Sequence, residues 1–231
     1  MIFKLRSTVA LSLILCLGLP TAGAVQASGA SDSAMAEPCC GQLNPEARHL
    51  LDMLNDSRVE VLWSSGRHID WETGEPDKPT GYVGPETKTH CSAYVAAMAK
   101  RLGVYVLRPP QHSQELLANA QTAWFGSAQG AQAGWYKVDT PRQAQMLANA
   151  GKLVVVSYQA NDPHRPGHIG IVRPDARRTL REIQEDGVWM TQAGETNYLR
   201  VSERTAFAHH PGAWPDGVRY FAHDVSSESK R

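Results

Sequence analysis

The chain has no excess of charge of either sign. Its 23 lysine and arginine residues balance 23 aspartate and glutamate residues, which gives a formal net charge of zero at pH 7. No stretch of the sequence gathers basic residues into a stripe, which is the usual electrostatic footprint of a nucleic-acid-binding protein. The charge distribution therefore argues against a nucleic acid as the partner.

Long apolar runs are also missing. The most apolar stretch, residues 8–19, is shorter than the roughly 20 residues that a membrane-spanning helix needs. It follows the basic residues Lys4 and Arg6, and small residues follow it. This order is typical of a secretory signal peptide. We expect residues 1–27 to be removed on export, which leaves a periplasmic or extracellular bacterial protein without a stable membrane anchor.

Cysteine is scarce, and its spacing does not suit a metal. Cys16 lies in the leader, so three cysteines remain: Cys39, Cys40 and Cys91. A closed zinc site needs four ligands, and no CxxC pair or helical HxxxH pair accompanies Cys39 and Cys40. We therefore expect no metal and no other cofactor. An odd number of cysteines in an oxidising compartment leaves one thiol over or implies an intermolecular bond. Closure of Cys39 on Cys40 is one alternative, and the sequence leaves their state open.

Internal repeats and wall-anchoring repeats are absent as well. Residues 28–42 are rich in Ser, Ala and Gly, which predicts a flexible segment. Residues 43–231 are enough for a single domain with its own core. Helical patterns precede hairpin-linked strand patterns in this stretch. The fold class we predict is α+β, with helices packed on one side of an antiparallel sheet.

The segment 89–103 carries the central residue of the functional hypothesis. Polar residues open an Ala-rich apolar run that Gly103 closes, which predicts a helix with Cys91 in its first turn. The unpaired N–H groups and the dipole at a helix start favour negative charge. A thiol in this position is biased toward the thiolate, which is its nucleophilic form.

A short strand pattern over 168–172 carries the candidate base. Alternation places Ile169 and Ile171 on the core side and His168 on the other side, beside the small Gly170. A cysteine on a helix followed by a histidine on a strand suggests a nucleophile with its general base.

The next strand pattern, 188–193, supplies a candidate partner for this histidine. In a hairpin, the first residue of one strand lies opposite the last residue of the other, so Gln192 comes near His168. This is the geometry that a base needs from an orienting group. Glu195 and Asn197 are the alternatives for this third position.

Residues 64–88 are rich in Gly, Pro and polar residues and predict a long loop. Loops of this length in a compact domain are functional or disordered. Trp71 and Tyr82 in this loop, together with Asn197, are our candidates for substrate contacts. The alternative for the two aromatic residues is that they only hold the loop in place.

Three motifs together resemble a known superfamily. They are Cys-Ser-x-x-Val at 91–95, Gly-His-Ile-x-Ile at 167–171 and a polar residue before alanine at 192–193. In this order they resemble the NlpC-like papain-fold peptidases and the related CHAP amidases, over about residues 85–200. Two departures are that His90 stands where the NlpC-like pattern has aspartate, and that the Cys-to-His interval is longer.

The resemblance implies a papain-like core, with the nucleophile helix packed on an antiparallel sheet. It also implies cleavage of an amide in cell-wall peptidoglycan or its peptide stems. By the same resemblance Cys91 is the nucleophile, His168 the base and acid, Gln192 the third member and Tyr82 an assisting tyrosine.

Two other function classes stay open. A non-catalytic wall-binding module would use tryptophans to stack on sugars, the candidates being Trp63, Trp71, Trp124 and Trp135. A protein-modifying cysteine enzyme on the same fold, such as a deamidase or transglutaminase, is the second. The sequence does not identify an inhibitor protein.

Overall fold

The computed structural model describes residues 33–225. The predicted leader, with Cys16, lies outside the described residues. Within the described part of the chain, no helix is both long enough and apolar enough to span a bilayer.

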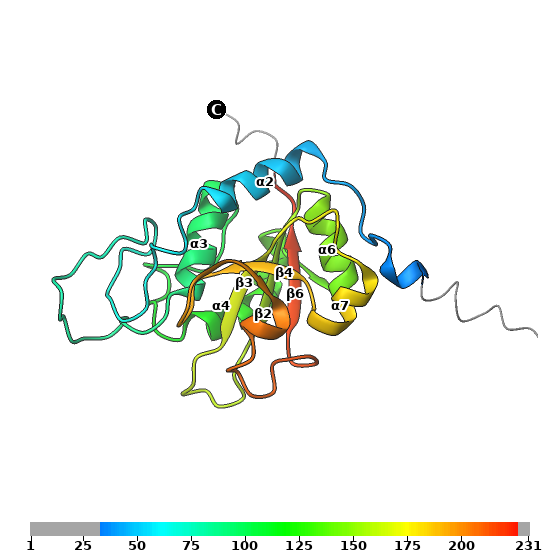
Figure 1. Cartoon of the computed structure of the whole chain (residues 1–231). Helices are drawn as coiled ribbons and strands as arrows, with labels where there is room; N and C mark the ends of the chain where they lie inside the picture. Colours follow the sequence, from blue (N-terminus) through cyan, green and yellow to red (C-terminus); the bar gives the residue numbers. More distant parts are fainter. Residues whose placement is uncertain (1–32, 226–231) are drawn as a thin grey trace, which may run out of the picture.

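The fold is α+β, as predicted, and helices precede most of the strands (Figure 1). In chain order its elements are α2 (Pro45–Asn55), α3 (Cys91–Arg101), α4 (Leu117–Phe125), α5 (Ala128–Gln132), β1 (Tyr136–Val138), α6 (Pro141–Asn149), β2 (Leu153–Tyr158), β3 (His168–Val172), α7 (Leu180–Asp186), β4 (Trp189–Gln192), β5 (Tyr198–Ser202), α8 (Glu203–Ala206) and β6 (Arg219–His223).

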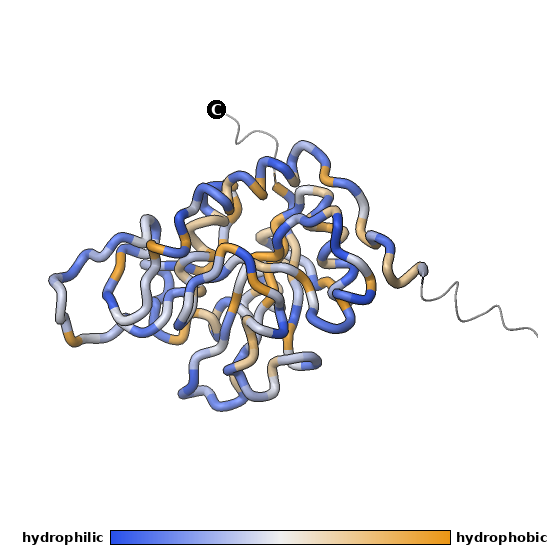
Figure 2. The backbone as a smooth tube through the Cα atoms, in the orientation of Figure 1, coloured by the Kyte–Doolittle hydropathy of each residue, from blue (hydrophilic) through white to orange (hydrophobic). Residues whose placement is uncertain are grey.

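One six-stranded sheet holds these elements together, in the order β1-β6-β2-β3-β4-β5. All of its strand pairs are antiparallel, as predicted. The β-branched run of β2 and the strand β3 lie at the centre, and every residue of both is buried. The hydropathy colouring shows the apolar segments gathered in this central region and mostly polar segments in the outer loops (Figure 2).

Helices cover both faces of the sheet, so the prediction of helices on one side was wrong. Figure 1 shows α3 and α4 on one side of the central strands and α6 and α7 on the other. Val155 and Ile169 belong to the core cluster that includes α3, whereas Val154 and Val156 belong to the cluster that includes Ala144 of α6. A strand buried on both faces reads as a continuous apolar run instead of an alternating one. The sequence of β2 has this character.

Helix α3 begins at Cys91 and is buried through Ala99. Its many alanines have no long side chains, so the helix packs closely against β3. His90, which precedes the helix, makes no side-chain capping hydrogen bond. Side-chain capping therefore does not compete for the N–H groups around Cys91.

The long connection between α2 and α3 is fixed to the domain at a few points. Trp63 is fully buried, its indole N–H donates to the carbonyl of Trp71 at 3.0 Å, and its ring meets Tyr94 edge to face. The amide group of Asn197 donates to the carbonyls of Val59 and Leu62. The loop is thus attached to the core and to the turn between β4 and β5.

The end of the segment predicted to be flexible is also attached. Cys39 and Cys40 form a disulfide with each other. The Cys39 N–H donates to the carbonyl of Arg178, and the amide of Asn149 donates to the carbonyls of Cys40 and Gly41. Cys91 is the free cysteine of the described chain.

Candidate functional site

Cys91 lies where helix α3 starts and is 3% exposed. Burial raises the pKa of its thiol to about 11, although the backbone N–H groups of Ile169, Ser92 and Cys91 itself each act to lower it. The helix start alone predicted a bias toward thiolate. Burial shifts the thiol pKa the opposite way, because removing the thiolate charge from water costs more free energy than the nearby amide dipoles contribute.

His168 and Gln192 lie side by side at facing strand ends. Nε2 of His168 is hydrogen-bonded to the side-chain oxygen of Gln192, and each residue is 4% exposed. The oxygen only accepts, so Nε2 carries the proton and Nδ1 of the neutral ring is the basic atom. Burial, together with the smaller effect of the neighbouring His210, lowers the pKa of His168 to about 4 against the opposing effect of the Gln192 contact. The imidazole is therefore neutral at pH 7.

The thiol and the imidazole lie on opposite faces of strand β3. Cys91 belongs to the core cluster of Ile169 and Ile171, and its thiol lies beside the Ile169 amide, one residue after His168. The His168 ring instead contacts Phe207, which belongs to the opposite cluster. No hydrogen bond joins the two groups within residues 33–225. Proton transfer between them needs a side-chain rotation or a bridging water.

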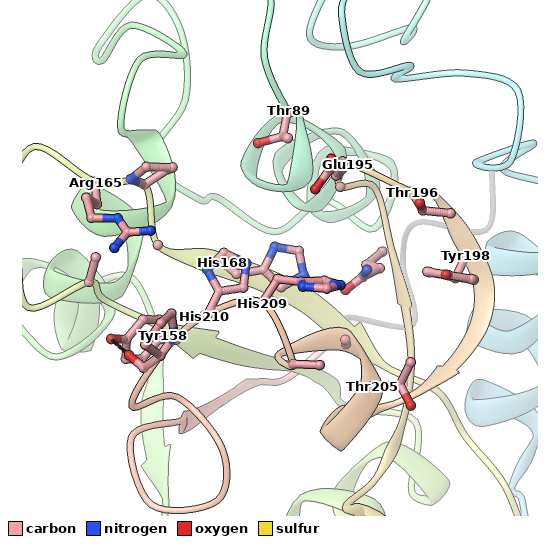
Figure 3. Close-up of a pocket in the computed structure, with 18 of the residues that line it drawn as sticks. Thr89, Tyr158, Arg165, His168, Glu195, Thr196, Tyr198, Thr205, His209 and His210 are labelled. Atoms are coloured by element: carbon pink, nitrogen blue, oxygen red, sulfur yellow. Dashed lines mark hydrogen bonds between the residues drawn. The ribbon is translucent and has the colours of Figure 1, made fainter.

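Two cavities flank this strand end. The larger, about 710 Å³, is lined by His168 and Gln192 and is drawn in Figure 3. The smaller, about 180 Å³, is lined by Cys91. Thr89, Pro166 and Gly167 line both cavities, so the two adjoin along these residues. Together they form a cleft with the thiol on one side and the imidazole on the other.

His210 is a site residue that the sequence analysis missed. Its ring stacks on His168 with 4.9 Å between centroids and 14° between planes, while Phe207 meets His168 edge to face. Both residues follow the short helix α8. The sequence analysis assigned no role to His210, because no local pattern shows which strand the segment after α8 will cover.

Trp71 and Tyr82, two predicted substrate-contact residues, do not line either cavity of this cleft. Trp71 lines a separate cavity beside the long loop and lies against the charged groups of Lys100 and Arg108. Tyr82 meets His68 edge to face and is 39% exposed. The structure therefore places both aromatic residues away from Cys91 and His168.

Among the candidates for the third position, Gln192 contacts His168. Asn197 accepts a hydrogen bond from the Gly194 N–H and donates to loop carbonyls, so both ends of its amide have structural partners. Glu195 lines the larger cavity. Within the described chain, no hydrogen bond links Glu195 or Asn197 to the imidazole.

The described residues contain no group of three or more His, Cys, Asp or Glu side chains arranged to hold a metal ion. The chain matches no protein-family model, and no curated protein matches it significantly.

Proposed function

We propose that the protein is an exported cysteine hydrolase with a papain-like core that cleaves an amide or peptide bond of cell-wall peptidoglycan. One observation carries the proposal. The hydrogen bond between His168 and Gln192 fixes a neutral imidazole at the start of β3, and the thiol of Cys91 lies beside the backbone of the next residue. A free thiol, a base and an orienting group thus gather around one strand end.

The chemistry is acyl transfer to sulfur. Nδ1 of His168 accepts the Cys91 proton, through a bridging water or after a side-chain rotation, as the sulfur attacks the carbonyl carbon. The Cys91 N–H at the helix start donates to the oxyanion, and an interaction of this kind is often worth about 3 kcal/mol. The imidazolium then protonates the leaving nitrogen, the C–N bond breaks, and water hydrolyses the thioester.

Gln192 orients the ring but carries no charge. It holds Nε2 through a neutral hydrogen bond, so it fixes the tautomer without offsetting the charge of the imidazolium as a carboxylate would. Its contribution is therefore smaller than that of the two reacting groups.

Three variants test the proposal. We expect Cys91→Ala and His168→Ala to abolish the release of soluble fragments from purified peptidoglycan, and Gln192→Ala to reduce it only partly. Mass spectrometry of the fragments would identify the new peptide or amide end and hence the bond. Circular dichroism would verify that each variant is folded.

Digestion that survives in the Cys91→Ala variant would contradict the proposal. An intact wall together with a modified protein substrate would favour the deamidase or transglutaminase alternative. Wall binding without cleavage would favour a binding module.

A further inference from the structure

The larger cavity has two chemically different ends. Figure 3 shows Arg165 at one end and Glu195, Thr196 and Tyr198 at the other, with the histidines between them. The first end presents the guanidinium of Arg165, and the other presents a carboxylate and hydroxyl groups.

Arg165 and the histidines beside it come from two segments far apart in the sequence. Arg165 comes from the turn before β3, and His209 and His210 come from the segment after α8. Burial lowers the pKa of His210, and the nearby charges of His209 and Arg165 lower it further. All three residues line the same cavity. Because its pKa is lowered, His210 is neutral at pH 7, so an anion here would meet the guanidinium charge of Arg165 and accept a neutral hydrogen bond from the imidazole.

The backbone at Arg165 is held by the fold, while its side chain is exposed. Its carbonyl accepts a hydrogen bond from the Asn119 amide at 2.9 Å, and the oxygen of the same amide accepts one from the Ala160 N–H. The turn is thereby tied to helix α4. Asp162, the acidic residue of this turn that also lines the cavity, accepts a hydrogen bond from the His164 N–H at 2.9 Å. Its carboxylate thus has a partner within its own turn.

The proposed reaction determines which part of the substrate lies at each end of the cleft. The sulfur of Cys91 keeps the acyl part of the substrate, so that part lies on the side of the smaller cavity. His168 delivers its proton to the leaving nitrogen, so the leaving amine lies on the side of the larger cavity. The group that departs is therefore the one that meets Arg165.

We propose that the leaving group carries a free carboxylate, which Arg165 binds with the help of His210. This inference rests on the proposed function and narrows its substrate class. The enzyme would release an amino acid or a short peptide from the carboxyl end of a stem peptide. Arginine suits this role because its guanidinium stays charged and can bind a carboxylate with two parallel hydrogen bonds.

A pair of peptides tests this specificity through binding alone, without cleavage. The stem peptide L-Ala-γ-D-Glu-L-Lys-D-Ala is prepared with a free C-terminal carboxylate and, as its partner, with a C-terminal carboxamide. Calorimetry on the Cys91→Ala protein measures binding of each without turnover. We expect the carboxylate form to bind at least tenfold more tightly. Arg165→Gln in the same background should remove that preference, and Arg142→Gln, a change at an exposed arginine on α6, should keep it.

Equal affinity for the two peptides, or no binding of either, would overturn this inference. A preference that persists in Arg165→Gln would overturn the role of that residue. The proposed function fails by a different result, namely the absence of any cleavage of peptidoglycan by the unmodified chain.

Discussion

At the scale of single residues, burial decides the protonation state of the site. Cys91 starts a helix and lies among backbone N–H groups, yet burial raises its pKa to about 11. The pKa of His168 moves the other way, to about 4, for the same reason. Both groups are neutral at pH 7. In the proposed reaction, the proton would therefore leave the thiol during the attack and not before it.

This protonation state predicts how the thiol titrates. The ultraviolet absorbance of the thiolate, taken as the difference between the chain and Cys91→Ser, should rise only well above pH 9, because burial disfavours the anion. In urea the same difference should rise near the ordinary thiol value of about 8.5. The disulfide between Cys39 and Cys40 leaves Cys91 as the reporting thiol of the described chain. A thiolate signal already present at pH 6 would refute this prediction.

The three central residues could be predicted from the sequence because each depends on local pattern. A helix start identified Cys91, strand alternation identified His168, and a hairpin argument placed Gln192 next to it. His210 could not be predicted in this way. Its contact with His168 depends on how the segment after α8 folds back, and that is decided by tertiary packing.

At the scale of elements, the turn that leads into β3 lines both cavities through Pro166 and Gly167. Gly167 lies against the β2 end of this turn. A Cβ atom there would come within 2.1 Å of the Tyr158 carbonyl oxygen and 2.4 Å of the Asn119 side-chain oxygen. Both oxygens belong to the structure that holds the Arg165 turn, so a side chain at 167 would displace the start of β3.

Gly167→Ala is therefore expected to lower the free energy of unfolding by about 2 kcal/mol, as is common for forced overlaps in packed regions. Urea denaturation measures this loss. Gly126→Ala is the matched control, because the nearest atom to its Cβ would be 3.7 Å away, an ordinary contact. Equal stability of the two variants would show that the turn can relax.

The arrangement of helices was the part of the fold that the sequence analysis misjudged. The β-branched run Leu153–Tyr158 indicates a buried strand, but a continuous apolar run does not say what covers each face. The alternation argument treated the Ile169 side of β3 as the core. In the structure Val172, on the other side, is buried as well. Local patterns identified the strands and their antiparallel pairing, whereas the second helical layer depends on long-range packing.

At the scale of the whole molecule, two buried groups make the free energy of unfolding depend on pH in opposite directions. Glu203 is fully buried, accepts hydrogen bonds from the Tyr220 hydroxyl and the Val188 N–H, and burial raises its pKa to about 7. The folded state therefore keeps a proton that the unfolded chain loses, so this group's stabilisation fades as pH rises toward and through 7. His168, with its lowered pKa, acts in the opposite direction because the unfolded chain binds its proton first.

Glu203→Gln separates the two effects. The free energy of unfolding of the unchanged chain, minus that of the variant, should fall by about 1 kcal/mol between pH 6 and pH 8. The variant alone should become more stable over this range, because the contribution of His168 remains. Denaturant titrations at several pH values measure both. A difference that does not change with pH would contradict a raised Glu203 pKa.

The strand order has a further consequence for solubility. The outermost strands are β1, which is only three residues long, and β5, whose first three residues are partly or fully exposed. Each carries a cationic side chain, Lys137 and Arg200, that resists alignment with a like-charged copy. Short, charged edge strands of this kind keep natural sheets from pairing with strands of other molecules. The sheet therefore offers little template for aggregation.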